Sequence, residues 1–210
     1  RGALAPPAEI LAFVERAGCE QIWIAASTMP PAGEGDVDED DAVIDAFHAL
    51  SGRHPRLLLI LAPRRPERFQ TAADKLTRAG LPFVRRAALT AETPAAPVLL
   101  LDSIGELCSL FGLADVVFMG GSLGCRGGHN ILEPAFFGRP VIVGPHMENF
   151  AAITADFIAA DAVVRIGSAA ELAPAVGELL GDPRRRAELG ARARAVAEAK
   201  RGATGRAVAV

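Results

Sequence analysis

Short apolar runs alternate with segments of helical periodicity along almost the whole chain, and this alternation limits the folds that are open to it. Most of the runs are continuously apolar, which is typical of parallel strands covered on both faces. We expect strands at residues 21–27, 56–63, 82–89, 97–102, 115–121, 140–145 and 162–167. We expect helices at 7–18, 37–51, 66–79, 104–113, 129–138, 149–160, 168–180 and 183–200. Regular alternation of this kind predicts an α/β fold with a Rossmann-like, doubly wound parallel sheet.

Two helix starts carry recognisable signals. Ser168 followed by Glu171 predicts a capping box at the start of the helix expected there. Asp182 and Pro183 predict an N-cap and a first helical position for the last helix. The chain of 210 residues begins RGALAPP, without a methionine, so we interpret it as part of a longer protein.

Charge and composition argue against several classes of protein. The net charge is −3 and the isoelectric point is near 5.8, so no strongly basic face for a nucleic acid is indicated. The three cysteines are widely spaced, which disfavours a disulfide framework or a zinc site and fits a reducing cytoplasm. No apolar run approaches the ~18–20 residues needed to span a bilayer, and no signal peptide is visible.

Constellations for metal binding or for a complete catalytic apparatus are not evident. The sequence shows no metal-ligand cluster, no acid–base pair of carboxylates and no Ser-His-Asp set. We expect the acidic stretch 36–41 to be a solvated loop rather than a metal site. Cys125 has no activating base that the sequence identifies, so we interpret it as an incidental thiol.

In a doubly wound sheet, ligands bind beyond the carboxyl ends of the strands, and the densest chemistry here follows the strand at 115–121. The stretch GGSLGCRGGHNILEP, residues 120–134, combines glycines with the start of a helix. Glycines would let backbone N–H groups converge on an anion such as a phosphate, and the helix N-terminus would favour its charge. Glu133 would accept hydrogen bonds from a ribose diol. A plain turn before a capped helix is the alternative.

The same stretch contains His129 and Asn130. His129 fits a base, an anion binder or a structural hydrogen-bonding group, and we favour an anion or sugar contact because no carboxylate partner is identifiable. Asn130 fits either a helix cap or a ligand contact.

Two further strand ends carry candidate residues. Ser27 and Thr28 follow the first strand and suit a phosphate or sugar contact, or a cap or turn. Arg64 follows the second strand and suits a phosphate or a base edge, or solvent.

Near the remaining strand ends, the alternatives are helix caps. Ser103 and Asp102 would cap the helix that follows them, with Glu106 completing a capping box. His146 and Asn149 are candidate ligand contacts or helix caps.

Four stretches carry a resemblance to a known family. They are WIAAST (23–28), LLLILAPRRPERF (57–69), LLLDSIGELCSLFGLADVVFMGGSL (99–123) and GGHNILEPAFFGRPVIVGPHMENF (127–150). Together they resemble the carboxyl-terminal half of bacterial 3-deoxy-D-manno-octulosonic acid (Kdo) transferase. The resemblance covers nearly all of residues 20–200 and is densest over 115–150.

The resemblance implies one half of a two-domain glycosyltransferase of the GT-B type. Such an enzyme transfers Kdo, with inversion, from the substrate CMP-Kdo to a lipid A precursor at the cytoplasmic face of the bacterial inner membrane, in lipopolysaccharide biosynthesis. The family needs no metal or cofactor for donor binding. Its amino-terminal domain holds the membrane anchor, the acceptor groove and the general base.

For this chain, the resemblance implies three segments: a linker and helix at 1–20, a nucleotide-sugar binding domain at 21–182, and a C-terminal helix and tail at 183–210. We therefore expect a soluble fragment without catalytic residues of its own, which binds CMP or a CMP-sugar weakly and does not transfer sugar alone.

By position, the resemblance also implies the residues of the donor site. Those lining it would be Gly121, Ser122, Gly128, His129, Asn130 and Glu133, with Glu133 on the ribose hydroxyls. Arg64 would face the nucleotide, Asn149 the phosphate or sugar, and Ser27 and Thr28 the interdomain cleft. Ser103 retains the hydroxyl of the threonine that is usual there. Two departures, Arg65 for histidine and Leu101 for glycine, put the details of cytidine recognition in doubt.

Other classes of protein remain open. A UDP-sugar GT-B transferase or epimerase would share the glycine loop and the ribose-binding glutamate. A non-catalytic domain that binds a nucleotide or a partner is also compatible, although the intact loop and Glu133 argue against loss of the site. An NAD-binding domain is disfavoured because the first strand ends in AASTMPP instead of GxGxxG.

Overall fold

A computed structural model describes residues 5–207, and the side chains of 5–201. Its centre is a seven-stranded sheet, with every recorded strand pair parallel and with the order β3-β4-β2-β1-β5-β6-β7. The strands are β1 (Gln21–Thr28), β2 (Leu57–Pro63), β3 (Phe83–Arg85), β4 (Val98–Leu100), β5 (Val116–Met119), β6 (Val141–Val143) and β7 (Val164–Arg165). Each of the seven strands overlaps one of the seven ranges expected from the sequence.

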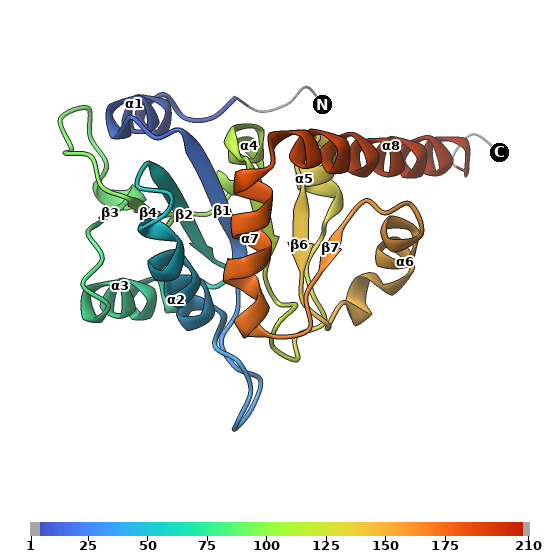
Figure 1. Ribbon diagram of the computed structural model, residues 1–210, viewed down its shortest axis with the longest axis horizontal. Helices are drawn as coiled ribbons and strands as arrows, with labels where there is room; N and C mark the ends of the chain where they lie inside the picture. Colours follow the sequence, from blue (N-terminus) through green and yellow to red (C-terminus); the bar gives the residue numbers. More distant parts are fainter. Residues whose placement is uncertain (1–4, 208–210) are drawn as a thin grey trace.

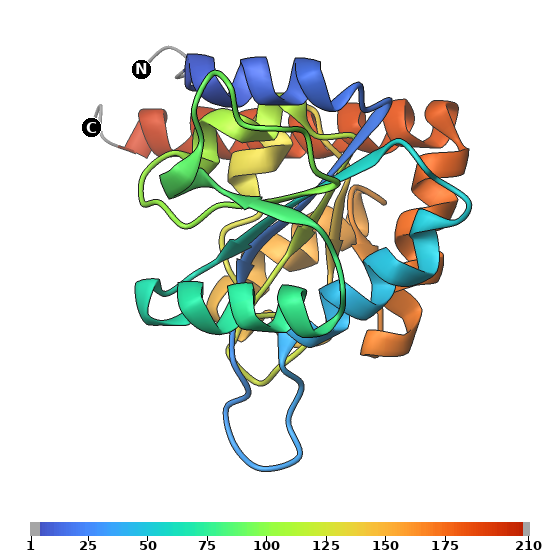
Figure 2. The ribbon, with the colours of Figure 1, turned by 90° about the vertical axis from the view of Figure 1, so that its left-hand side faces the viewer.

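Helices cover both faces of the sheet, which confirms the doubly wound arrangement (Figures 1 and 2). One face packs against α2 (Glu39–Ser51), α3 (Phe69–Arg78) and α7 (Leu172–Gly181). The other face packs against α1 (Ala8–Ala17), α4 (Leu107–Leu110), α5 (Leu132–Phe136), α6 (Ala151–Ala159) and α8 (Pro183–Ala207). Because apolar side chains fill both layers, the strands are buried on both sides and their runs are apolar throughout.

Several helices begin later than their sequence pattern predicts, because a 3₁₀ turn precedes them. Such turns occupy Pro66–Arg68, Glu148–Phe150 and Ala169–Glu171. The predicted capping box is not formed as expected: the Ser168 hydroxyl donates to Glu171, which also accepts the N–H of Gly167 at 3.0 Å. The prediction for the last helix is confirmed, since Asp182 accepts the Arg185 N–H at 2.9 Å and α8 begins at Pro183.

The strand predicted at 82–89 is much shorter than expected. It ends at Arg85, and a 3₁₀ turn follows at Arg86–Ala88. The buried Asp102 carboxylate explains the early end, because it accepts hydrogen bonds from the Arg85 side chain at 2.6 Å and from the Ala87 N–H at 2.8 Å. Residues 1–4 and 208–210, at the outer ends of the first and last predicted segments, lie outside the described residues.

The order of the strands places a topological switch point between β1 and β5. Strands β2, β4 and β3 lie in that order on one side of β1. The chain then crosses to the other side of β1, where β5, β6 and β7 lie. The loops that follow β1 and β5 meet at one edge of the molecule (Figures 1 and 2). Clefts for ligands form at this position in open α/β sheets.

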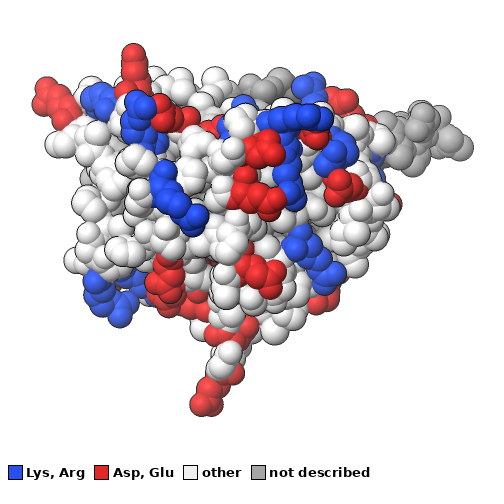
Figure 3. All heavy atoms as spheres, in the orientation of Figure 1, with Lys and Arg blue, Asp and Glu red and all other residues white. Residues whose placement is uncertain are grey.

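Charged side chains of both signs are mixed over the face displayed in Figure 3. This agrees with the small net charge of −3 and shows no single-signed patch on that face. Within the described residues, no helix is both long and apolar enough to cross a membrane.

Candidate functional site

A cavity of about 360 Å³ opens at the carboxyl ends of β1, β2 and β5, next to the switch point. Five of the predicted site residues line it: Ser27, Arg64, His129, Asn130 and Glu133. The rest of its wall consists of Gly105, Leu107, Cys108, Phe111, Met119 and Phe150, which sequence reasoning did not identify. A few polar groups set in an apolar wall are typical of a small-molecule site.

Ser27 has an unusual backbone conformation at the end of β1. Its φ is 56°, in the left-handed region that favours glycine. The register between β1 and β2 shifts between Ala26 and Thr28, so Ser27 forms a bulge. Bulges and left-handed non-glycine residues concentrate at functional sites, and Ser27 lies in the cavity wall.

Arg64 and His129 bring nitrogen donors to the cavity. The Arg64 N–H bonds to the Thr28 carbonyl at 3.0 Å, which fixes the arginine backbone beside the end of β1. Among the described residues, no ion pair is recorded for the Arg64 guanidinium. The buried His129 Nε2 also has no hydrogen-bond partner there. Burial, and then the charge of Arg64, lower the pKa of His129, so its ring is neutral at pH 7.

Asn130 and Glu133 are positioned by the start of α5, which lies later than the sequence predicts. The helix begins at Leu132, whose N–H bonds to Asn130 Oδ1 at 3.1 Å. Asn130 Nδ2 also donates to the Glu133 carboxylate at 3.3 Å. In the described part of the chain, the N–H groups of His129 and Asn130 have no recorded acceptor. Both residues line the cavity.

Cys108 lies in the same wall. Burial and then the negative charge of Glu133 raise the pKa of its thiol. The thiol is therefore protonated at neutral pH and acts as an apolar group rather than a nucleophile.

The first half of the glycine loop does not present its N–H groups to an external anion. The N–H groups of Gly121, Ser122 and Leu123 donate to the carboxylate of Glu39, at 2.6, 2.9 and 2.8 Å. The Met29 N–H donates to the same carboxylate at 2.8 Å. The predicted phosphate cradle is thus wrong for residues 121–123, because a buried side chain of the protein already fills it.

The glycines of this loop make room for protein atoms. A Cβ on Gly121, where φ is 70°, would lie 2.9 Å from the His129 ring. A Cβ on Gly127 would lie 2.5 Å from Asn149, and one on Gly128 would overlap Met147. The close approach that the glycines permit is therefore between parts of the chain itself.

Four other predicted residues have protein partners and do not line the cavity. Thr28 is buried and donates to Asp40 at 2.6 Å, and the Ser122 hydroxyl donates to the Met119 carbonyl at 2.5 Å. The Ser103 hydroxyl bonds to Glu106, and Asn149 Nδ2 donates to the Arg126 carbonyl at 3.1 Å. Gly121 and Gly128 likewise lie outside the lining and shape the loop.

The acidic stretch 36–41 is not a solvated loop, and this expectation is wrong. Glu39 and Asp40 are buried at the start of α2, and Asp38 caps that helix. Arg68 pairs with Asp38 and Asp40, and Lys75 pairs with Asp38 at 2.7 Å. Burial acts to raise the pKa of Asp38, but Lys75 and Arg68 outweigh it, so this pKa lies below its usual range.

Cys125 has a nearby base that the sequence does not reveal. Its sulfur lies 3.5 Å from His146 Nε2, and His146 Nδ1 lies 3.2 Å from the exposed Glu148 carboxylate. The histidine predicted as a ligand contact or cap therefore contacts the thiol instead. Cys125 and His146 do not line the cavity described above.

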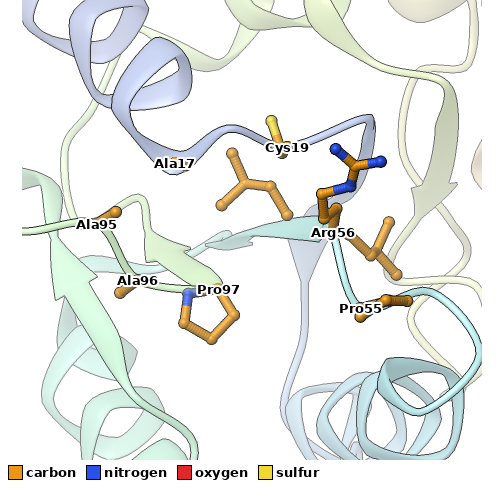
Figure 4. A pocket seen from close by; sticks show the side chains of 9 residues that line it. Ala17, Cys19, Pro55, Arg56, Ala95, Ala96 and Pro97 are labelled. Atoms are coloured by element: carbon orange, nitrogen blue, oxygen red, sulfur yellow. The ribbon is translucent and has the colours of Figure 1, made fainter.

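A second cavity, of about 240 Å³, lies at the opposite edge of the sheet, where β2 and β4 begin (Figure 4). Its lining is Ala17, Cys19, Pro55, Arg56, Leu57, Leu58, Ala95, Ala96 and Pro97. Its only charged side chain, Arg56, pairs with the exposed Glu20. This cavity lacks convergent polar groups, so the cavity at the switch point is the better candidate.

Within the described residues, no group of three or more His, Cys, Asp or Glu side chains is placed to hold a metal ion.

Known proteins resemble this chain in both sequence and structure. No protein-family model matches the sequence. The chain is 41% identical over 170 residues to the 3-deoxy-D-manno-octulosonic acid transferase of Haemophilus influenzae, covering 80% of this chain and 38% of that protein. It is 42% identical over 172 residues to the Bordetella pertussis enzyme of the same name, covering 80% and 40%. The chain thus spans about two fifths of the length of these relatives.

A solved structure matches nearly end to end. It is the C-terminal CMP-Kdo binding domain of WaaA from Acinetobacter baumannii, with 31% identity and a TM-score of 0.77, covering 89% of this chain and 98% of that domain. The expected fold, a Rossmann-like half of a GT-B glycosyltransferase, is confirmed. The chain therefore belongs to the 3-deoxy-D-manno-octulosonic acid transferase family, and it corresponds to the C-terminal domain of that family.

Proposed function

We propose that this chain is the donor-binding half of a Kdo transferase and that CMP-Kdo binds in the cavity at the switch point. The observation that carries the proposal is the convergence of Ser27, Arg64, His129, Asn130 and Glu133 on one cavity, in a domain whose relative of known structure binds CMP-Kdo. These residues come from three separate strand ends and lie up to about a hundred positions apart.

The lining divides into groups that suit the parts of a nucleotide-sugar. The Arg64 guanidinium, the His129 ring and the free N–H groups of His129 and Asn130 would hold the phosphate. The Glu133 carboxylate would accept hydrogen bonds from the ribose diol. The apolar wall, formed in part by Phe111 and Phe150, would exclude water around the ligand.

The two departures from the family pattern lie outside this lining. Arg65 is exposed and pairs with Glu67 at 3.6 Å. Leu101 is buried in the core beneath one face of the sheet. Neither side chain contacts the cavity, so neither argues for a different nucleotide.

The activity of the whole protein extends this proposal. The complete enzyme would transfer Kdo to a lipid A precursor at the inner membrane, in lipopolysaccharide biosynthesis, without a metal or cofactor. The general base and the acceptor groove would lie in the amino-terminal part of the protein. This chain alone would bind the donor weakly and would not transfer sugar.

Isothermal titration of the 210-residue chain with CMP, CDP, UDP and GDP tests the donor assignment. We expect the cytidine nucleotides to bind more tightly than UDP and GDP. Preference for UDP would favour a UDP-sugar transferase or epimerase, and binding of none would contradict a donor site. A Kdo transfer assay, with and without the amino-terminal domain supplied separately, tests whether this half is inactive alone.

A further inference from the structure

Glu39 has a charged side chain that takes no part in the proposed ligand contacts. It is the first residue of α2, and its exposed fraction is 0%. It does not line the cavity. Burial raises the pKa of its carboxyl group, and the surrounding backbone N–H groups act in the opposite direction. A buried carboxylate is expensive unless its oxygens are satisfied.

Four backbone N–H groups satisfy the two oxygens. One oxygen accepts from Met29 at 2.8 Å and from Gly121 at 2.6 Å. The other accepts from Ser122 at 2.9 Å and from Leu123 at 2.8 Å. Four donors match an ionised carboxylate, because a protonated one would place an O–H against an N–H.

These bonds join the two sides of the switch point. Met29 belongs to the loop after β1, and the other three donors belong to the loop after β5. The Glu39 N–H also bonds back to the Met29 carbonyl at 3.2 Å. One side chain therefore holds both loops against the start of α2.

Two cavity residues lie directly beside these contacts. Ser27 precedes Met29 by two residues, and its carbonyl would be 2.5 Å from a Cβ on Gly120. The His129 ring packs against Gly121, as the 2.9 Å distance to an added Cβ shows. The Glu39 carboxylate thus bonds to both chain segments against which Ser27 and His129 lie.

The start of α2 is itself held in place. Asp40, the next residue, accepts hydrogen bonds from Thr28 at 2.6 Å and from Arg68 at 2.7 Å. Asp38, the preceding residue, pairs with Arg68 and Lys75. These contacts fix the point from which the Glu39 side chain extends.

We propose that Glu39 is a positioning residue for donor binding, which fills the N–H cradle of the glycine loop from inside and holds Ser27 and His129 at the separation the ligand needs. The part of the inference that concerns donor binding rests on the proposed function. The contacts of Glu39 with the two loops do not depend on it. It also implies that the donor phosphate does not bind to the N–H groups of residues 121–123.

Amide hydrogen exchange on the ligand-free chain tests the cradle without any variant. We expect the amides of Met29, Gly121, Ser122 and Leu123 to be protected already, and CMP to add little to their protection. Rapid exchange that becomes slow only when CMP binds would overturn the proposal, because the cradle would then belong to the ligand. This result does not depend on which nucleotide the protein prefers.

The substitution Glu39→Gln tests the effect on binding. Its amide group would place two N–H donors against backbone N–H groups, so we expect a loss of protection confined to the two loops. Titration should show the Kd for CMP rising by about tenfold or more, because small displacements of binding groups have large effects. Asp45→Asn, an exposed acid on the same helix, should change neither measurement.

Leu50→Ala provides the control for general destabilisation. Leu50 is buried at the opposite end of α2 from Glu39, where its side chain lies against Gly177 of α7. It should lower the unfolding midpoint and leave the Kd for CMP unchanged. Equal weakening of CMP binding by L50A and E39Q, or unchanged binding in E39Q, would overturn the positioning role. Failure of the wild-type chain to bind CMP would instead count against the proposed function, and the exchange experiment would still decide the cradle.

Discussion

The two halves of the glycine loop look alike in sequence and differ in what they contact. In the first half, residues 120–124, the backbone N–H groups of 121–123 bond to the internal Glu39 carboxylate. In the second half, residues 127–133, the side chains of His129, Asn130 and Glu133 line the cavity. Glycines therefore indicate close backbone approach, but they do not say whether a ligand or the protein itself is approached. The first half is structural, and the second half is where we place the ligand.

The largest effect should come from adding a methyl group to the first half. A Cβ on Gly120 would lie 2.5 Å from the Ser27 carbonyl oxygen and 2.8 Å from a Glu39 oxygen. We expect Gly120→Ala to lower the free energy of unfolding by about 2–4 kcal/mol, measured by urea denaturation. Gly33→Ala, where an added Cβ meets nothing within 4 Å, is the control. A G120A variant as stable as the wild type would show that the first half is not tightly packed.

In the second half, substitution should affect binding and spare stability. Glu133→Ala should weaken CMP binding by about 1–3 kcal/mol if the carboxylate holds a ribose diol. Titration gives the affinity, and thermal unfolding should show little change because the side chain is only partly buried. Glu92→Ala, at an exposed loop position, is the matched control. Unchanged affinity in E133A would remove Glu133 from the site.

The ion pairs of Asp38 support the first half of the glycine loop, and they should make the free energy of unfolding depend on pH. The pKa of Asp38 lies below its ordinary value in the folded protein, so its ionised form stabilises the fold. That contribution is complete above the ordinary pKa, about 4, and is lost as the pH falls through the folded-state pKa. Asp38→Asn, which keeps a helix-capping side chain, should cost about 1–2 kcal/mol at pH 7.

Urea denaturation of D38N and wild type from pH 7 down to pH 3 checks this sign. The difference between them should shrink as the pH falls below about 4. Asp41→Asn removes the other, 58% exposed partner of Lys75 and should cost less than about 0.5 kcal/mol. A difference that stays constant with pH would show that the Asp38 charge does not support the loop.

The smallest effect should come from relaxing Ser27, which lies between the two halves. Because its φ is 56°, Ser27→Gly should raise the free energy of unfolding by up to about 1 kcal/mol. The same change should weaken CMP binding a few-fold, since it removes a hydroxyl from the cavity wall. Ser27→Ala removes the hydroxyl and keeps the strain, so the pair separates the two effects. Lower stability in S27G would mean that the conformation is not strained.

The fold was predictable from the sequence because continuous apolar runs are a direct consequence of burial on both faces. The second half of the loop was predictable as part of a cavity wall, since His129 and Glu133 follow a strand end and line the cavity with their own side chains. The role of Glu39 was not predictable, because three of its four partners lie 82 to 84 positions away and no local pattern marks an acid as buried. The left-handed conformation of Ser27 also has no sequence signature, since serine rarely adopts it.

The two hydrogen bonds between Met29 and Glu39 affect how the protein tolerates a change in the length of the loop between these residues. The two residues are tied by the Met29 N–H to the Glu39 carboxylate and by the Glu39 N–H to the Met29 carbonyl. The chain between them, at 30–37, projects beyond the edge of the sheet (Figures 1 and 2). Residues 30, 31 and 36 bond to the glycine loop, through Arg126 and the Cys125 N–H, so only the exposed tip at 33–35 is free of these contacts. Because closing a longer loop between fixed ends costs little, we expect insertions at 33–35 to leave the neighbouring cavity undisturbed, which makes this tip the place to graft a tag or a peptide.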